Sequence, residues 1–119
     1  MLSVSWFEIP VNDMERAKKF YESLFGVEIN VVDFGGLLMG WLPAKEGGSS
    51  GALVKQESYI PSYEGTMIYF GVEEVNDVLD RVVPAGGKIV NPKQSIGEYG
   101  YVGHFEDSEG NRVALHQNA

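Results

Sequence analysis

Residues 3–26 read SVSWFEIPVNDMERAKKFYESLFG and predict a strand that runs directly into a helix. The strand signal is the mixture of β-branched and aromatic residues up to Val11. Asn12, with Glu15 three residues later, is a plausible helix cap, and Asp13 is the competing cap position. The helix should end at Gly26, because up to that point apolar residues recur at steps of three and four: Met14, Ala17, Phe20, Tyr21, Leu24 and Phe25.

Three further strands complete the first half of the chain, and the second half repeats the same order. The first three are expected at Val27–Phe34, Leu37–Leu42 and Gly51–Lys55, divided by glycine-rich turns. The second half predicts a strand at Thr66–Val72, a helix from Val75 that ends at Pro84 and Gly86-Gly87, and strands at Lys88–Val90, Tyr101–Glu106 and Arg112–Gln117. A polar turn at 107–111 joins the last two strands.

The repeated order predicts an α+β fold made of two βαβββ modules within one domain, residues 1–119. The modules are residues 1–58 and 66–119, and residues 59–65 form the connector between them. The halves match in residue type rather than identity, with Trp6 falling on Met67 and Val11 on Val72. A generic α+β sandwich without internal symmetry is the alternative.

Composition limits the classes of function. Nine Lys and Arg against 17 Asp and Glu give a net charge of -8, which argues against binding to nucleic acid or to an anionic membrane. The absence of cysteine excludes disulfides, thiolate nucleophiles and Cys-ligated metals. Because we find neither a signal-peptide pattern nor an apolar run near the roughly 20 residues that span a bilayer, we expect a cytoplasmic protein.

Alternation along the two module-opening strands predicts one face for the core and one for a pocket. The core faces are Phe7, Ile9 and Val11 in the first module and Ile68, Phe70 and Val72 in the second. The opposite faces combine aromatic, apolar and charged groups, namely Trp6, Glu8 and Pro10 and then Met67, Tyr69 and Gly71. Such a mixture is typical of the wall of a small-molecule pocket.

These residues also resemble a known family, the glyoxalase/bleomycin resistance/extradiol dioxygenase (vicinal oxygen chelate, VOC) superfamily. The similar stretches are Trp6–Val11 with Asp13, Phe20-Tyr21, Phe25-Gly26, Gly97–Tyr101 and, most specific of all, Asp107-Ser108-Glu109-Gly110-Asn111-Arg112-Val113-Ala114-Leu115. The resemblance implies two modules that form a pair of curved, mixed-sheet half-barrels around a central cavity, often within a homodimer. It also implies that metal-dependent relatives use a divalent ion to chelate neighbouring oxygens of the substrate, whereas other relatives bind drugs without a metal.

The metal-ligand positions of the superfamily fall here on residues without suitable donors. They coincide with Trp6, Met67, Ala114 and the stretch Gly51-Ala52-Leu53. An indole nitrogen only donates, a methyl group has no lone pair, and a thioether is a poor ligand for hard or borderline divalent ions. We therefore expect no metal at this site and no cofactor.

Glu8, His104 and His116 are the candidates for chemistry. His116 should share the cavity side of its strand with Ala114, and His104 should lie opposite Ala114 if the last hairpin pairs in register. Either histidine suits proton transfer or a structural hydrogen bond, and with Glu8 and Glu106 the pair could form a displaced metal site. Glu8 would orient a ligand, act as a base, or bond structurally to Tyr69.

The sequence thus predicts metal-independent binding or conversion of a small organic molecule. The expected cavity lining is Trp6, Glu8, Met67, Tyr69, His104, Ala114 and His116. One alternative is a divalent-metal lyase of the lactoylglutathione lyase type, or a dioxygenase, with shifted ligands. Another is a structural or protein-interaction module in which aromatic side chains plug the barrel. A homodimer is expected in each case.

Overall fold

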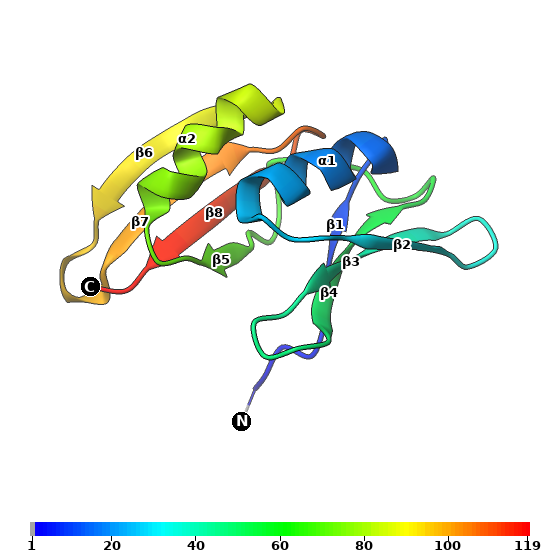
Figure 1. The fold of residues 1–119 in the computed structure, drawn as a ribbon, viewed down its shortest axis with the longest axis horizontal. Coiled ribbons are helices and arrows are strands. Elements are labelled where there is room, and N and C mark those ends of the chain that lie inside the picture. Colours follow the sequence, from blue (N-terminus) through cyan, green and yellow to red (C-terminus); the bar gives the residue numbers. More distant parts are fainter. Residues whose placement is uncertain (1) are drawn as a thin grey trace.

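The computed structural model describes residues 2–119 and contains the two predicted βαβββ modules in chain order (Figure 1). The first module consists of β1 (Phe7–Pro10), α1 (Met14–Phe25), β2 (Asn30–Asp33), β3 (Leu38–Pro43) and β4 (Ser49–Lys55). The second consists of β5 (Tyr69–Gly71), α2 (Val75–Ala85), β6 (Lys88–Ser95), a short 3₁₀ helix (Gly97–Tyr99), β7 (Tyr101–Glu106) and β8 (Arg112–Gln117).

Each module forms one four-stranded mixed sheet with the same topology. The strand orders are β1-β4-β3-β2 and β5-β8-β7-β6, and in both sheets the opening strand runs parallel to the last one. All other neighbours are antiparallel. The internal repeat predicted from the element order is therefore confirmed.

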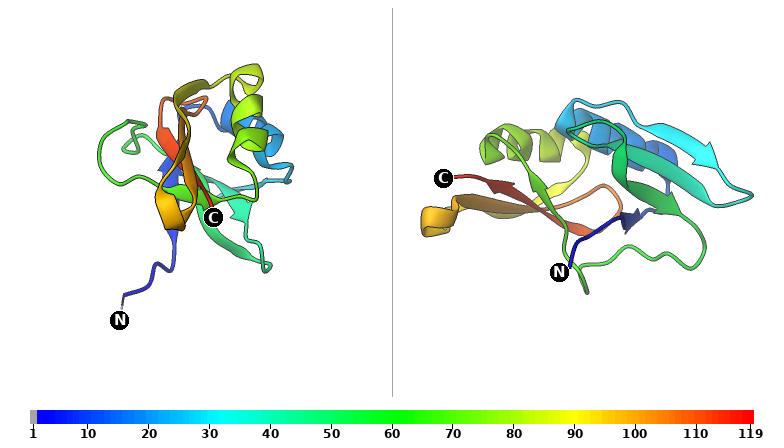
Figure 2. Two further views of the ribbon diagram at one scale, coloured as in Figure 1. Left: turned by 90° about the vertical axis from the view of Figure 1, so that its left-hand side faces the viewer. Right: turned by 90° about the horizontal axis from the view of Figure 1, so that it is seen from below.

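Both helices lie on one side of the two sheets, as Figure 2 shows in the view from below. Helix α1 packs on β3 and β4, and α2 packs on β6, β7 and β8. The opposite faces of the sheets are not covered by any helix of residues 2–119, and the two sheets do not close into a barrel within this chain. None of these helices is both long enough and apolar enough to cross a membrane.

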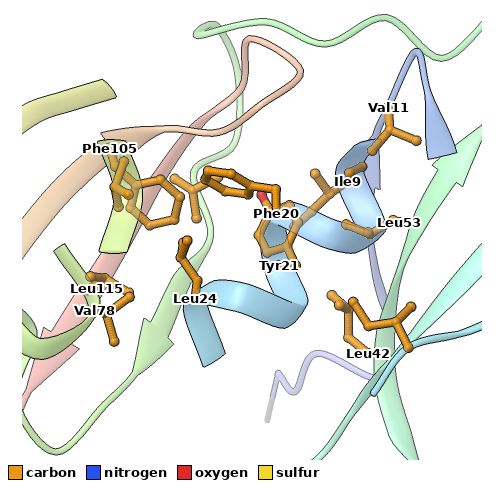
Figure 3. Packing of buried hydrophobic residues seen from close by; sticks show 14 of the residues in the cluster. Ile9, Val11, Phe20, Tyr21, Leu24, Leu42, Leu53, Val78, Phe105 and Leu115 are labelled. Atoms are coloured by element: carbon orange, nitrogen blue, oxygen red, sulfur yellow. The ribbon is translucent and has the colours of Figure 1, made fainter. Parts of the chain in front are cut away.

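Helix α1 lies between the cores of the two modules (Figure 3). Phe20, Tyr21 and Leu24 are at most 1% exposed. The Phe20 ring lies 6.0 Å from that of Phe105 in the second module, whereas Ile9 and Leu53 of the first module belong to the same hydrophobic cluster. Burial of these side chains on both flanks of one helix makes the two sheets share a single core.

The ends of several elements differ from the prediction. Asp13, not Asn12, caps α1, because its carboxylate accepts a hydrogen bond from the Arg16 amide at 3.1 Å. Gly26 ends the helix as predicted, with a φ of 62° that favours glycine. Strand β6 continues to Ser95 past the predicted end at Val90, because Pro92 sits in an edge strand whose register is irregular there.

The turn between β7 and β8, residues 107–111, fastens the second module to the start of α1. Glu109 has a fully buried side chain, and its Oε1 accepts the backbone amides of Asn12 and Asp13 at 2.9 and 2.8 Å. The Arg16 guanidinium donates to the same carboxylate, with an Nε to Oε2 distance of 2.7 Å. The negative charge thus sits at the positive end of α1, where the helix dipole stabilises it.

Tyr21 and Asp107 add a second, fully buried link. The Tyr21 hydroxyl donates to Asp107 Oδ2 at 2.6 Å, and the side-chain amide of Asn111 donates to the same oxygen. Burial and the neighbouring carboxylate raise the pKa of Tyr21 well above its usual value, so the hydroxyl stays protonated. The 107–111 turn therefore connects the two modules, a structural role that its sequence did not predict.

We expect Glu109→Gln to lower the free energy of unfolding by about 1–3 kcal/mol, because its amide nitrogen would face the donors of Arg16. Burial raises the pKa of Glu109, but hydrogen bonds from Arg16, Asp13, Ser108 and Asn12 outweigh it and leave this pKa lowered. The stabilisation is then present above the unfolded-state pKa and lost as the pH falls through the folded-state pKa. Urea denaturation at pH 7 and at acid pH measures both effects, with Glu46→Gln in an exposed loop as the control. An equal difference at both pH values would contradict the assignment.

Candidate functional site

The uncovered faces of the two sheets present equivalent rows of side chains. In the first sheet Glu8 lies opposite Ala52, and Ala52 lies opposite Trp41. In the second sheet the corresponding row is Tyr69, Ala114 and His104. The predicted hairpin register, with His104 opposite Ala114, is confirmed. Each row therefore has a methyl group at its centre and larger side chains on both sides.

His104 is the most defined group in the second row. Its ring stands edge-on to that of Tyr69, with centroids 5.8 Å apart. Arg112 Nη2 lies 2.9 Å from His104 Nδ1, and because a guanidinium can only donate, Nδ1 is the acceptor and the ring proton is on Nε2. Burial, together with the positive charge of Arg112, lowers the pKa of His104. At neutral pH the imidazole is therefore neutral and offers an Nε2–H donor.

Glu8 is held by two hydrogen bonds, one to each oxygen. The Trp6 indole donates to Oε2 at 3.2 Å, and the Tyr59 hydroxyl donates to Oε1 at 3.0 Å. Tyr59, from the segment between the modules, thus takes the place that the sequence suggested for Tyr69. The hydrogen bond to Glu8 and its negative charge raise the pKa of Tyr59. Glu8 is exposed rather than buried, so its oxygens can still accept hydrogen bonds from a ligand.

Of the remaining candidates, Trp6 contacts Glu8, whereas Met67 and His116 have other surroundings. Trp6 packs edge-on against Trp41 with centroids 5.5 Å apart, and Met67 is half-buried just before β5. His116 lies two residues beyond Ala114 in β8, and its Nε2 donates to the Tyr99 carbonyl at 2.7 Å. That bond ties the end of β8 to the 3₁₀ helix, which is a structural role.

A cavity of about 230 Å³ lies between the modules, bounded by β1, the segment between the modules and the start of β8. Glu8 and Pro10 border it on one side, Ser62 and Glu64 on another, and Arg112 on the third. Of the predicted lining residues, only Glu8 borders this cavity. A second hollow of about 350 Å³ lies over β2 and β3 beside Trp41.

Arg112 and Tyr59 are the site residues that sequence reasoning missed. Tyr59 was placed in the connector, where no periodicity predicts the direction of a side chain. Arg112 is the first residue of β8, directly after the 107–111 turn. Because side chains alternate along a strand, residue 112 lies on the same face of the sheet as Ala114 and His104. That alternation was the available signal for Arg112.

The residues at the superfamily's metal positions do not fit a divalent ion. The Trp6 nitrogen is already a donor to Glu8, and Ala52 and Ala114 are fully buried methyl groups in mid-strand. Met67 offers only a thioether. Within residues 2–119 no three His, Asp or Glu side chains lie close enough together to share a metal ion.

Comparison with known proteins agrees with the fold. The model of the Glyoxalase/Bleomycin resistance protein/Dioxygenase superfamily matches residues 3–115, and the chain belongs to this superfamily. A putative glyoxylase, CFP32, of Mycobacterium bovis is 32% identical over 117 residues, which are 95% of this chain and 44% of that protein. The chain therefore spans less than half the length of this relative.

Solved structures of low sequence identity share the fold. A glyoxylase/bleomycin resistance protein/dioxygenase domain from Frankia superposes with a TM-score of 0.77 at 16% identity, covering 100% of this chain and 99% of that one. A maize glyoxalase I mutant gives a TM-score of 0.75 at 24% identity and covers 95% of this chain but 46% of its own. These similarities establish the fold alone.

We expect Arg112→Met to raise the pKa of His104, because the nearby positive charge is removed while most of the apolar packing is retained. NMR titration of the two histidine rings measures the change, and His116 serves as the internal reference. Arg81→Met is the matched control, since the Arg81 guanidinium donates to the Leu24 carbonyl at 2.9 Å. A His104 pKa that is unchanged or lower in Arg112→Met would show that Arg112 does not act on the ring.

Proposed function

We propose that this protein binds a small organic molecule against the uncovered faces of its sheets, without a divalent metal ion. The observation that supports the proposal best is the replacement of every superfamily ligand position by indole, thioether or methyl groups. Ala52 and Ala114 are fully buried at the row centres, so the space available to a ligand is the 230 Å³ cavity that Glu8 and Arg112 border. We also propose a cytoplasmic location.

The flanking side chains suit recognition of an organic ligand. Trp41 and Tyr69 are 38% and 49% exposed and offer aromatic surface, whereas Glu8 and His104 offer an acceptor and a donor of hydrogen bonds. If the protein also converts its ligand, these two groups are the available proton carriers. A carboxylate and a neutral imidazole can support proton transfer, but they cannot replace the ion that polarises substrate oxygens in metal-dependent relatives.

We further propose that two chains complete the cavity as a homodimer. Large apolar side chains such as Val32, Trp41 and Tyr69 are exposed on faces that no helix of residues 2–119 covers. The matched regions make up only 44% and 46% of the mycobacterial and maize chains, so each of those chains has room for a second domain of this size. A second copy of this chain would supply the equivalent surface.

A thermal-shift screen with neutral and charged small molecules tests the binding. We expect at least one compound to raise the melting temperature in a dose-dependent manner, because a ligand specific for the folded state stabilises it. The shift should be the same after dialysis against a chelator. Stoichiometric metal held by the protein's own side chains, with binding lost after chelation, would instead support the metal-dependent lyase or dioxygenase.

Light scattering coupled to size exclusion tests the assembly. We expect a mass twice that of the 13.1-kDa chain, and a ligand affinity that weakens on dilution once the dimer dissociates. A monomer at high protein concentration that still binds ligand would contradict the shared cavity. A monomer that binds no compound of the screen would favour the interaction module.

A further inference from the structure

Arg112 is a half-buried cation with no acidic partner among residues 2–119. The chain has 17 Asp and Glu residues, and yet within residues 2–119 the ion pairs involve Arg16, Lys18 and Lys93, and none involves Arg112. Glu106 lies directly opposite Arg112 in the β7–β8 register, but its Oε1 accepts the Tyr63 hydroxyl at 2.6 Å instead. A half-buried charge is ordinarily compensated, so the missing partner requires an explanation.

The hydrogen bonds of the guanidinium are also incomplete. Of its three nitrogens, only Nη2 has side-chain partners among residues 2–119, and both are uncharged: the ring of His104 at 2.9 Å and the amide oxygen of Asn91 at 3.3 Å. Nε is buried and has no acceptor in the described chain. Nη1 has no partner among residues 2–119 either, so a terminal nitrogen of the guanidinium is left to bind an anion that enters the cavity.

Arg112 borders the 230 Å³ cavity between the modules, and the rest of the lining defines what kind of anion could enter. Glu8 and Glu64 border the same cavity, so a multiply charged anion would be repelled. The Asn111 side chain is already used, because its amide nitrogen donates to the Pro10 carbonyl and its oxygen accepts the Ser62 amide. Arg112 is thus the cationic end of a cavity that also has acidic groups.

We propose that Arg112 binds the carboxylate of a small ligand whose other end has a hydroxyl or amino group directed at Glu8 and Glu64. This inference rests on the proposed function, since it names the chemical class of the ligand. A planar carboxylate matches the donor geometry of a guanidinium, and a single negative charge is the most that the acidic lining tolerates. A four-carbon ligand fits within the cavity of about 230 Å³, since a cavity of about 150 Å³ already holds benzene.

A four-carbon series separates the two ends of the ligand. The probes are butyrate, 4-hydroxybutyrate, 4-aminobutyrate and the neutral butyramide, titrated into the ¹⁵N-labelled protein and followed by NMR. We expect 4-hydroxybutyrate and 4-aminobutyrate to bind more tightly than butyrate, and butyramide to bind at least about tenfold more weakly than either. The Arg112 Nε–H resonance should shift on binding, and the His104 pKa should rise because the bound carboxylate offsets the charge of Arg112.

Variants assign the effect to particular residues. Arg112→Met should weaken binding of the carboxylates by about tenfold or more, and Arg112→Lys should retain part of the affinity because it keeps the charge. Arg81→Met, remote from the cavity lining, should bind like the wild type. Glu64→Gln should weaken the binding of 4-aminobutyrate, because the Glu64 carboxylate attracts its ammonium group. The same variant should strengthen the binding of butyrate, because that carboxylate repels it.

The outcomes separate this inference from the proposed function. If neutral compounds bind and Arg112→Lys and Arg112→Met leave every affinity unchanged, the inference is wrong while small-molecule binding stands. If no compound of the four-carbon series binds but a neutral compound of the thermal-shift screen does, only the inference is wrong. If no compound of the series or of the screen binds, both are wrong. The wild-type pattern of NMR shifts away from the cavity confirms that each variant is folded.

Discussion

Glu109 at the start of α1 is the contact on which the arrangement of the two modules depends. A turn of the second module places a fully buried carboxylate against two amides and a guanidinium of the first. Tyr21 and Asp107 form a second link about two turns further along the helix. Because α1 also packs on Phe105 of the second module, its position sets the relation between the two sheets. The cavity between the modules, and the approach of Arg112 to it, follow from that relation.

The same topology is fastened differently in the second module. At the start of α2, Glu74 caps the helix and Gln117 accepts the Val75 amide, and both residues belong to the same module as the helix. The internal symmetry therefore holds for strand order but not for the contacts at the helix starts. Equivalent positions also differ in the rows on the uncovered faces, where Glu8 corresponds to Tyr69 and Trp41 to His104.

What the sequence could predict depends on how local the signal is. Helix α1, its end at Gly26 and the pairing of His104 with Ala114 follow from periodicity and turn residues, and all three are confirmed. Tyr59 could not be predicted as the partner of Glu8, because they are 51 residues apart and an irregular segment sets the position of Tyr59. The role of Glu109 depends on packing between modules, which no local pattern describes. The sequence allowed either Asn12 or Asp13 as the cap of α1, and the structure has Asp13. Sequence patterns rarely distinguish between adjacent cap positions, because helix ends vary by one or two residues.

The two alanines at the row centres shape the chemistry left to this protein. A carboxylate at either position would lie within a strand, between an aromatic residue and a charged or polar one. Because the central residue of each row is an alanine, the polar groups lie only on the residues that flank it. On one sheet the polar group is an acid that two donors already hold, and on the other it is a neutral imidazole next to an uncompensated guanidinium. Groups of opposite charge that border a common cavity favour a ligand that is itself polar at both ends. The chain carries a charge of -8, so Arg112, which has no acidic partner among residues 2–119, is the natural point of attachment for the ligand's anionic end.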